Sequence, residues 1–372
     1  MKKMLLTVPT FFGTESILTH EIRSLGYETS EVTDGKVTLE GDSEAIALLN
    51  INLRCGERVL IKMAEFKATT FEQLFEGVRA VEWEEFVEKN YAFPVKGSSL
   101  SSTLSSVPAC QSIIKKAVVK RLEGKYGISH FEETGALVRI QFTIIRDNVT
   151  LYLDTTGEPL YKRGYRTQGV VAPMRETLAF SMIDITRWRG DRPFADIFCG
   201  SGTIPIEAAL YAKNIAPGKN RKFVSETWST VGREFYESAR EEALENEKLD
   251  APVRIYASDI DPQAVELAKE NARRAGVLKY IDFKVCDMQD APLFEDKGVL
   301  VSNPPYGERL LDKKQCNILY QKLGRKLSPY TNMGKYILTS HEEFEKFYGK
   351  TADKKRKLYN GMLKCYLYQY FK

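Results

Sequence analysis

Four consecutive residues toward the end of the chain carry the strongest chemical signature in the sequence. Asn303, Pro304, Pro305 and Tyr306 directly follow an apolar run, residues 298–302. The prolines end any strand and hold the backbone rigid and extended, so that the Asn303 amide oxygen and the Pro304 carbonyl become fixed acceptors. An amine on an aromatic ring is a poor nucleophile, because its lone pair is delocalised. Two acceptors that hold its N–H groups would raise the electron density on nitrogen and aim it at an electrophilic methyl group.

Tyr306 adds an aromatic face on which a base could stack once it is unpaired or extruded. An Asn-Pro-Pro turn alone is usually structural, but here an apolar strand precedes it, an aromatic residue follows it and a glycine-rich loop lies upstream. We therefore predict that Asn303, Pro304, Pro305 and Tyr306 are catalytic. The chemistry of the motif permits adenine N6, cytosine N4, guanine N2 or a glutamine amide as the acceptor of the methyl group.

The glycine-rich loop follows a predicted strand and opens a predicted helix, Thr203–Ala212. Glycines let the backbone approach a ligand closely and expose amides at a helix N-terminus. A nucleotide or flavin site, or a turn without a ligand, would look similar. The residues that we expect to bind a cofactor here are Phe198, Cys199, Gly200, Gly202 and Thr203.

Two later strands end in carboxylates that could bind an adenosine group. Asp259 could accept hydrogen bonds from both ribose hydroxyls. Asp287 could accept one from the adenine amino group, while Met288 or Ile260 packs on the ring. Asp261 precedes Pro262 and is better explained as a helix N-cap.

The spacing of these residues argues against a dinucleotide-binding dehydrogenase. Asp259 lies 57 residues after Gly202, whereas that fold expects about 20. We interpret the excess, residues 213–250, as an insertion that contains a basic run at 219–222 and a charged helix at 234–248.

Hydrophobic periodicity divides the chain into two regions. Up to residue 170, short strands mix with amphipathic helices, which is typical of a compact α+β region. Within it we predict a polar loop at 98–106. From residue 173, strands and helices alternate, which predicts a doubly wound α/β sheet. Asn360-Gly361 between two strand-like runs predicts a final antiparallel hairpin.

Composition narrows the class of protein. No apolar run approaches the ~20 residues needed to cross a bilayer. Six scattered cysteines without a CxxC pair, and three distant histidines, predict a cytoplasmic protein without a metal site. Residues 91–172 carry 11 basic against 6 acidic residues, and residues 301–372 carry 15 against 6. Such blocks indicate a polyanionic partner, although solvated lysines would give the same counts.

With these motifs in this order, the chain resembles the class I amino-methyltransferases, which carry an Asn/Asp-Pro-Pro-aromatic signature. The resemblance implies a Rossmann-like sheet within residues 161–372 and S-adenosylmethionine as the cofactor. It adds Asp196 to the binding loop and places Pro173 and Thr177 beside the methionine part of the cofactor. Ile197 departs from the pattern, since a proline often occupies that position.

The front half is similar to the ferredoxin-like and THUMP region of bacterial large-subunit rRNA guanine-N2 methyltransferases. The similarity is carried by residues 161–166 (Tyr-Lys-Arg-Gly-Tyr-Arg) and the segment from Pro173. It implies a ferredoxin-like part at 1–55, a THUMP RNA-binding domain at 56–160, and guanine N2 of 23S rRNA as the target.

Two other hypotheses stay open. An adenine-N6 DNA methyltransferase would share the chemistry but would need a target-recognition domain, and only residues 340–372 follow the last predicted parallel strand. An RNA-binding ribosome-assembly protein with a vestigial cofactor pocket belongs to another class, and the intact residues 303–306 argue against it.

Overall fold

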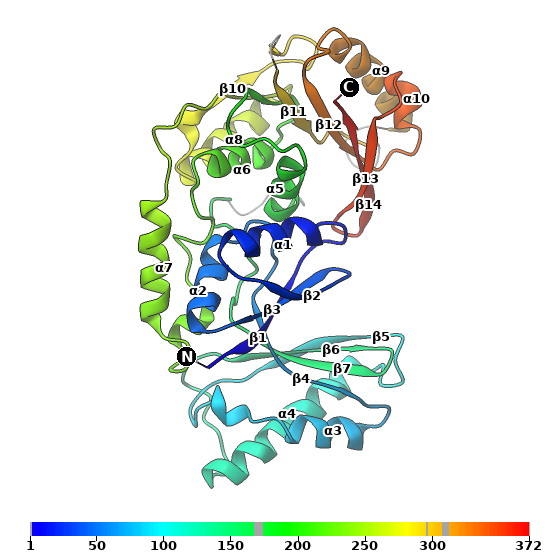
Figure 1. Cartoon of the computed structure of the whole chain (residues 1–372). Coiled ribbons are helices and arrows are strands. Elements are labelled where there is room, and N and C mark those ends of the chain that lie inside the picture. Colours follow the sequence, from blue (N-terminus) through cyan, green and yellow to red (C-terminus); the bar gives the residue numbers. More distant parts are fainter. Residues whose placement is uncertain (1, 167–173, 295–296, 307–311, 372) are drawn as a thin grey trace. The chain divides into compact units, whose positions relative to one another are not determined.

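The computed structural model describes residues 2–166, 174–294, 297–306 and 312–371 (Figure 1). These residues form two compact units. Unit 1 comprises Met1–Pro9, Thr19–Leu160 and Asn220–Glu242. Unit 2 comprises Thr10–Leu18, Tyr161–Lys219 and Ala243–Lys372. Each unit is built on its own seven-stranded sheet.

The sheet of unit 1 has the strand order β2-β3-β1-β4-β7-β6-β5, and all its pairs are antiparallel except β5 with β6. Its strands are β1 Met4–Pro9, β2 Thr29–Thr33, β3 Lys36–Gly41, β4 Leu60–Lys67, β5 Val95–Leu100, β6 Arg139–Ile145 and β7 Asn148–Asp154. The helices of this part of the chain are α1 Glu15–Ser24, α2 Ser43–Asn52, α3 Phe71–Arg79 and α4 Val107–Tyr126. This is the α+β arrangement expected from the mixed pattern of strands and helices.

The prediction of a loop at 98–106 is wrong in its first part. Val95–Leu100 forms the edge strand β5, which pairs with β6 along its whole length. A Cβ atom on Gly97 would lie 2.3 Å from the Phe142 carbonyl oxygen, so glycine is required where β5 crosses β6. Most side chains of β5 are exposed, and an edge strand of this kind lacks the apolar alternation on which the prediction relied.

The insertion between the glycine-rich loop and Asp259 supplies part of unit 1. Its described elements are the 3₁₀ turn Val224–Thr227 and helix α7 Arg233–Glu245. The Tyr236 hydroxyl accepts a hydrogen bond from Asn50 Nδ2 (3.0 Å), and the Trp228 indole donates to the Leu137 carbonyl (2.9 Å). Arg221 donates to the carbonyls of Glu158 and Leu160. The basic run at 219–222 therefore makes internal contacts through this arginine.

The sheet of unit 2 has the order β10-β9-β8-β11-β12-β14-β13, parallel except for the antiparallel strand β14. Its strands are β8 Phe194–Asp196, β9 Ile255–Asp259, β10 Ile281–Val285, β11 Val299–Ser302, β12 Gly334–Thr339, β13 Lys354–Asn360 and β14 Leu363–Tyr370. Its helices are α5 Glu176–Ile185, α6 Thr203–Ala212, α8 Pro262–Arg274, α9 Lys313–Leu327 and α10 Phe344–Tyr348. The doubly wound sheet with a final hairpin is confirmed.

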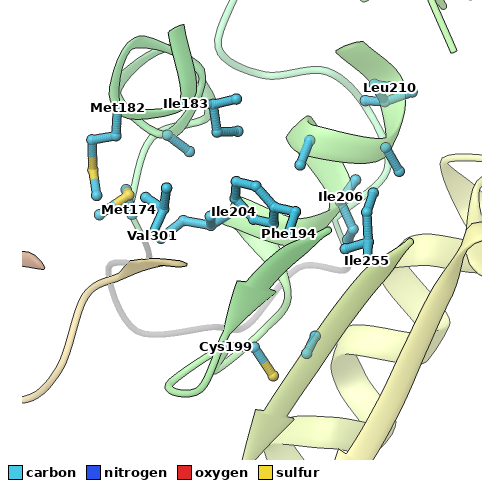
Figure 2. Close-up of a cluster of buried hydrophobic side chains, with 14 of the residues drawn as sticks. Met174, Met182, Ile183, Phe194, Cys199, Ile204, Ile206, Leu210, Ile255 and Val301 are labelled. Atoms are coloured by element: carbon cyan, nitrogen blue, oxygen red, sulfur yellow. The ribbon is translucent and has the colours of Figure 1, made fainter. Parts of the chain in front are cut away.

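Alternate residues of these strands enter two different cores, because side chains of a strand point to opposite faces. Phe194 and Val301 pack with helices α5, α6 and α8 on one face. Figure 2 shows Met182, Ile183, Ile206 and Leu210 gathered around Phe194 in this core. Ala195 and Leu300 pack with helices α9 and α10 on the other face. Burial on both faces explains the continuous apolar runs of the parallel strands.

No helix within the described residues is both long enough and apolar enough to span a membrane.

Candidate active site

The predicted motifs meet where the strand order of unit 2 reverses. From β8 the chain passes to β9 on one side, while β11 lies on the other side of β8. Open α/β sheets bind their ligands at this point, at the carboxyl ends of the strands. Ser302 Oγ donates to Asp196 Oδ1 (2.7 Å) and accepts from the Ile197 amide (3.1 Å). The end of β11, which leads into Asn303, is thereby fixed to the end of β8, which leads into the glycine-rich loop.

The glycine-rich loop has a conformation that requires its glycines. Gly202 has φ +84°, and a Cβ atom there would lie 2.9 Å from Ala268 Cβ of α8. Gly200 has φ +51°, and its Cβ position faces open space. The Gly200 amide donates to Asp259 Oδ2 (2.9 Å), so the structure brings together this loop and the carboxylate at the end of β9. Asp261 accepts from the Gln263 amide at the start of α8, which confirms the predicted N-cap.

The other residues predicted to bind the cofactor differ in exposure. Ile260 is 66% exposed, whereas Met288 is 4% exposed and packs in the core beneath α9. Asp287 is exposed and accepts from the Gln289 amide. Cys199 lies in the core beneath α6, while Phe198 is half-buried. Of the two side chains proposed to pack on an adenine ring, only Ile260 is exposed.

Tyr165 and Arg166 anchor helices α5 and α6. They belong to the segment 161–166, on which the resemblance of the front half rests. Arg166 donates to Thr203 Oγ1 (2.8 Å) and forms an ion pair with Glu176 (2.8 Å). The Tyr165 hydroxyl donates to Glu207 of α6 (3.1 Å). Thr177 is fully buried on α5, and Pro173 lies outside the described residues. These contacts hold the first turn of α6, and with it the glycine-rich loop.

The Asn-Pro-Pro-Tyr corner is held by hydroxyl groups that sequence analysis did not identify. The Tyr306 hydroxyl donates to Asn303 Oδ1 (2.8 Å) and accepts from Asn360 Nδ2 (3.0 Å). The Tyr320 hydroxyl donates to the Pro305 carbonyl (2.7 Å). No donor to the Pro304 carbonyl occurs among the described residues.

The Tyr306 hydroxyl orients the Asn303 side chain in this structure. Its ring packs partly against the core of the sheet, and burial raises the pKa of its hydroxyl to about 12. The hydroxyl thus stays protonated near neutral pH and remains a donor to Asn303. An amide oxygen has two lone pairs, so Asn303 Oδ1 can accept a second hydrogen bond.

The residues around the loop fit a ligand with polar groups. Asp196 is 1% exposed, and no described residue donates to its Oδ2. Buried polar atoms seldom lack a partner unless a ligand or an ion supplies one. The open space at Gly200 and the carboxylate of Asp259 adjoin this point. Such a set suits a ligand that carries hydroxyl groups and N–H donors.

The carboxyl of Asp196 should make stability depend on pH. Burial raises its pKa to about 7, above the ordinary value of an aspartate. The folded state therefore disfavours the ionised form, and stability should fall as pH rises toward 7. Without cofactor, the Tm of Asp196→Asn minus the Tm of the native protein should increase by about 3 °C or more from pH 5 to pH 8. Burial also raises the pKa of Glu176 to about 7. Because Glu176 is present in both proteins, its effect on Tm cancels in the difference. A difference in Tm that stays constant with pH would refute this explanation.

Comparison with protein-family models decides the classification. The RMKL-like methyltransferase domain matches residues 163–369, the RlmL ferredoxin-like domain matches 5–60 and the THUMP domain matches 68–154. The chain belongs to the RMKL-like methyltransferase family. The resemblance to THUMP-containing class I methyltransferases is thereby confirmed, as is S-adenosylmethionine as the cofactor of this family.

Individual relatives agree with this assignment. The chain is 46% identical to YpsC of Bacillus subtilis (strain 168), named as a candidate RNA methyltransferase, over 100% of the chain and 97% of that protein. It is 32% identical to the ribosomal RNA large subunit methyltransferase K/L of Psychromonas ingrahamii, over 98% of the chain but 49% of that protein. The chain thus spans about half the length of this second relative.

Two solved structures share the whole fold. The crystal structure of SMU.472, a methyltransferase candidate complexed with SAH, has a TM-score of 0.95 and 41% identity, covering 100% of this chain and 98% of that one. A protein from Listeria monocytogenes str. 4b F2365, described as a predicted N6-adenine-specific DNA methylase, has a TM-score of 0.94 and 46% identity, covering 100% and 96%. The names of these similar proteins thus differ in substrate, with RNA for YpsC and DNA for the Listeria protein.

Proposed function

We propose that this protein is an RNA methyltransferase that transfers a methyl group to an exocyclic base amine, guanine N2 of 23S rRNA. The observation that carries the proposal is the acceptor pair at the end of β11. Asn303 Oδ1 is oriented by Tyr306, and the Pro304 carbonyl accepts from no described residue. Both stand beside the loop of β8, to which Ser302 ties them. Bound S-adenosylmethionine supplies a methyl group on a sulfonium sulfur.

The catalytic contribution of the protein lies in positioning and electrostatics. One N–H of the amine donates to Asn303 Oδ1 and the other to the Pro304 carbonyl, which raises the electron density on nitrogen. The Tyr306–Asn360 pair keeps the amide in one orientation, so that less entropy is lost when the amine binds. The exposed part of the Tyr306 ring provides the surface on which the base stacks. Asp259, Gly200 and Asp196 bind the cofactor.

RNA is favoured over DNA by the front of the chain. Residues 68–154 match the THUMP domain, which resemblance associates with structured RNA. Relatives that match nearly the whole chain are named as RNA or ribosomal RNA methyltransferases. The name of the Listeria protein leaves DNA as the competing substrate, and the motif itself does not distinguish the two.

The direct test is transfer of a labelled methyl group. Purified protein and labelled S-adenosylmethionine are incubated with total rRNA, or with genomic DNA, from cells that lack this protein. The proposal predicts label in rRNA and none above background in DNA. Label only in DNA would overturn it, and rRNA from cells that contain the protein should accept much less label, because its target is already methylated.

A further inference from the structure

Five basic residues and no acidic residue occupy positions 354–364, which form the hairpin of β13 and β14. Cross-strand pairing opposes Lys357 to Tyr366 and Tyr359 to Lys364. Directly opposed residues of an antiparallel pair share one face, so lysines and tyrosines alternate on this face of the hairpin. The ammonium group of Lys357 lies 5.3 Å from the ring centroid of Tyr359, and that of Lys364 lies 5.3 Å from that of Tyr366.

These two lysines differ from Lys355 and Arg356 of the same hairpin. Lys355 forms an ion pair with Glu345, and Arg356 donates to the Gly13 carbonyl. No carboxylate of the described residues forms an ion pair with Lys357 or Lys364, and both side chains are exposed. Their charge is therefore left for an external anion.

A loop from the start of the chain widens this face with an aromatic ring. Residues 10–18 belong to unit 2. Arg356 donates to the Gly13 carbonyl through Nε and Nη2, and the Gly13 Cβ position lies 3.0 Å from the Lys357 carbonyl oxygen. The loop is thus held against strand β13. It presents Phe12, which is 56% exposed, edge-on to the Tyr359 ring at 6.1 Å.

The tip of the hairpin lies at the edge of the sheet that carries the candidate active site. Thr339, the last residue of β12, opposes Tyr366, so the hairpin extends past the carboxyl end of β12 toward Asn360. Asn360 Nδ2 donates to Tyr306, which donates to Asn303. Asn360 of the hairpin is therefore linked through two hydrogen bonds to Asn303 Oδ1, the proposed acceptor of the amine.

We propose that Phe12, Lys357, Tyr359 and Lys364, here called the hairpin-tip surface, bind the single-stranded nucleotides that flank the target base. The rings stack on bases and the lysines contact phosphates, a combination that binds single strands with little sequence preference. Charge complementarity and continuity with the catalytic corner favour RNA over a protein partner. This proposal rests on the proposed function, because it assumes that the substrate is RNA.

The test measures binding of the full chain to a fluorescein-labelled, unstructured 12-nucleotide RNA by fluorescence anisotropy at several salt concentrations. Phe12→Ala should raise Kd about fivefold or more, since one stacked base is lost. Lys357→Gln combined with Lys364→Gln should lower the slope of log Kd against log salt by about 1.4, or ~0.7 for each phosphate contact on a single strand. Cofactor affinity by calorimetry should be unchanged in both variants, which shows that unit 2 is folded.

Matched controls lie elsewhere in unit 2. Phe371→Ala removes a phenylalanine that is 48% exposed at the far end of the same hairpin. Lys279→Gln with Lys284→Gln removes two exposed lysines, one in the 3₁₀ turn Leu278–Tyr280 and one in β10, on the opposite edge of the sheet. Both controls should bind the RNA like the native protein.

The proposal would be overturned if the hairpin-tip variants had the Kd and salt slope of the native protein, or if the controls lost as much affinity. A protein partner would then be the remaining candidate for this surface. The binding assay needs no methyl transfer, so the two proposals fail separately. Transfer to rRNA together with unaffected variants overturns only this inference. Binding that depends on the hairpin-tip surface, with label appearing only in DNA, overturns the proposed function and leaves the surface as a binding site for single strands other than an RNA substrate.

Discussion

Replacing Asn303 with alanine is expected to lower the single-turnover rate of methyl transfer by ~10²-fold or more, since the variant loses an acceptor that acts on the reacting amine. Cofactor affinity should stay close to that of the native protein, because the glycine-rich loop and Asp259 are untouched. Rapid-quench transfer to rRNA and calorimetry with S-adenosylmethionine measure the two quantities. Tyr306→Phe keeps the ring but removes the hydroxyl that donates to Asn303 and accepts from Asn360, so we expect a smaller loss, about tenfold.

The matched control is Asn332→Ala, which removes an exposed asparagine before β12, at the other end of the sheet. Its transfer rate should equal that of the native protein. If Asn303→Ala transferred methyl groups at the native rate, the amine would not be held at this residue. If its cofactor affinity fell in parallel with its rate, the side chain would belong to the cofactor site.

Replacing Asp259 with alanine is expected to raise the Kd for S-adenosylmethionine by about 10- to 100-fold. Hydrogen bonds to a charged group contribute about 1.5–3 kcal/mol, and this carboxylate also holds the Gly200 amide at 2.9 Å. At saturating cofactor the transfer rate should recover most of its native value, since Asn303 and Tyr306 are intact.

Asp282→Ala is the control, because it removes an exposed carboxylate from the neighbouring strand β10. It should leave cofactor affinity unchanged. An unchanged Kd in Asp259→Ala, or a loss of rate that saturating cofactor does not restore, would show that this carboxylate does not bind the cofactor.

The fold of unit 2 could be predicted because its local signals agree with one another. The parallel strands are apolar on both faces, and the helix from Thr203 to Ala212 has the predicted bounds. The hairpin followed from Asn360-Gly361, where Gly361 has φ +66°. In this unit, periodicity, turn residues and element length all indicate the same structure.

The elements that were missed depend on tertiary contacts. Strand β5 is an exposed edge strand whose pairing with β6 no local pattern reveals. The inserted segment has the sequence of a charged surface helix, yet Trp228 and Tyr236 are buried in unit 1. A charge pattern shows that a segment is helical, but not which unit it joins.

The residues of the candidate site also divide into those that the sequence reveals and those that it does not. The residues at the ends of β8, β9 and β11 could be found because their types are chemically distinctive. Ser302, Tyr320 and Asn360 could not, since each acts through hydrogen bonds to residues that lie far away in the sequence. Asn360 was recognised only as a turn residue, and its side chain nevertheless reaches Tyr306.

The most direct test of the whole account is mass spectrometry of nucleosides from rRNA that this protein has methylated. Ribosomal RNA from cells lacking the protein is treated with protein and S-adenosylmethionine, digested and compared with an untreated sample. We expect one new nucleoside methylated on an exocyclic amine, N2-methylguanosine. A methyl group found only on a ring carbon, a ring nitrogen or a ribose oxygen would contradict this expectation, because none of these groups offers two N–H donors to Asn303 and Pro304.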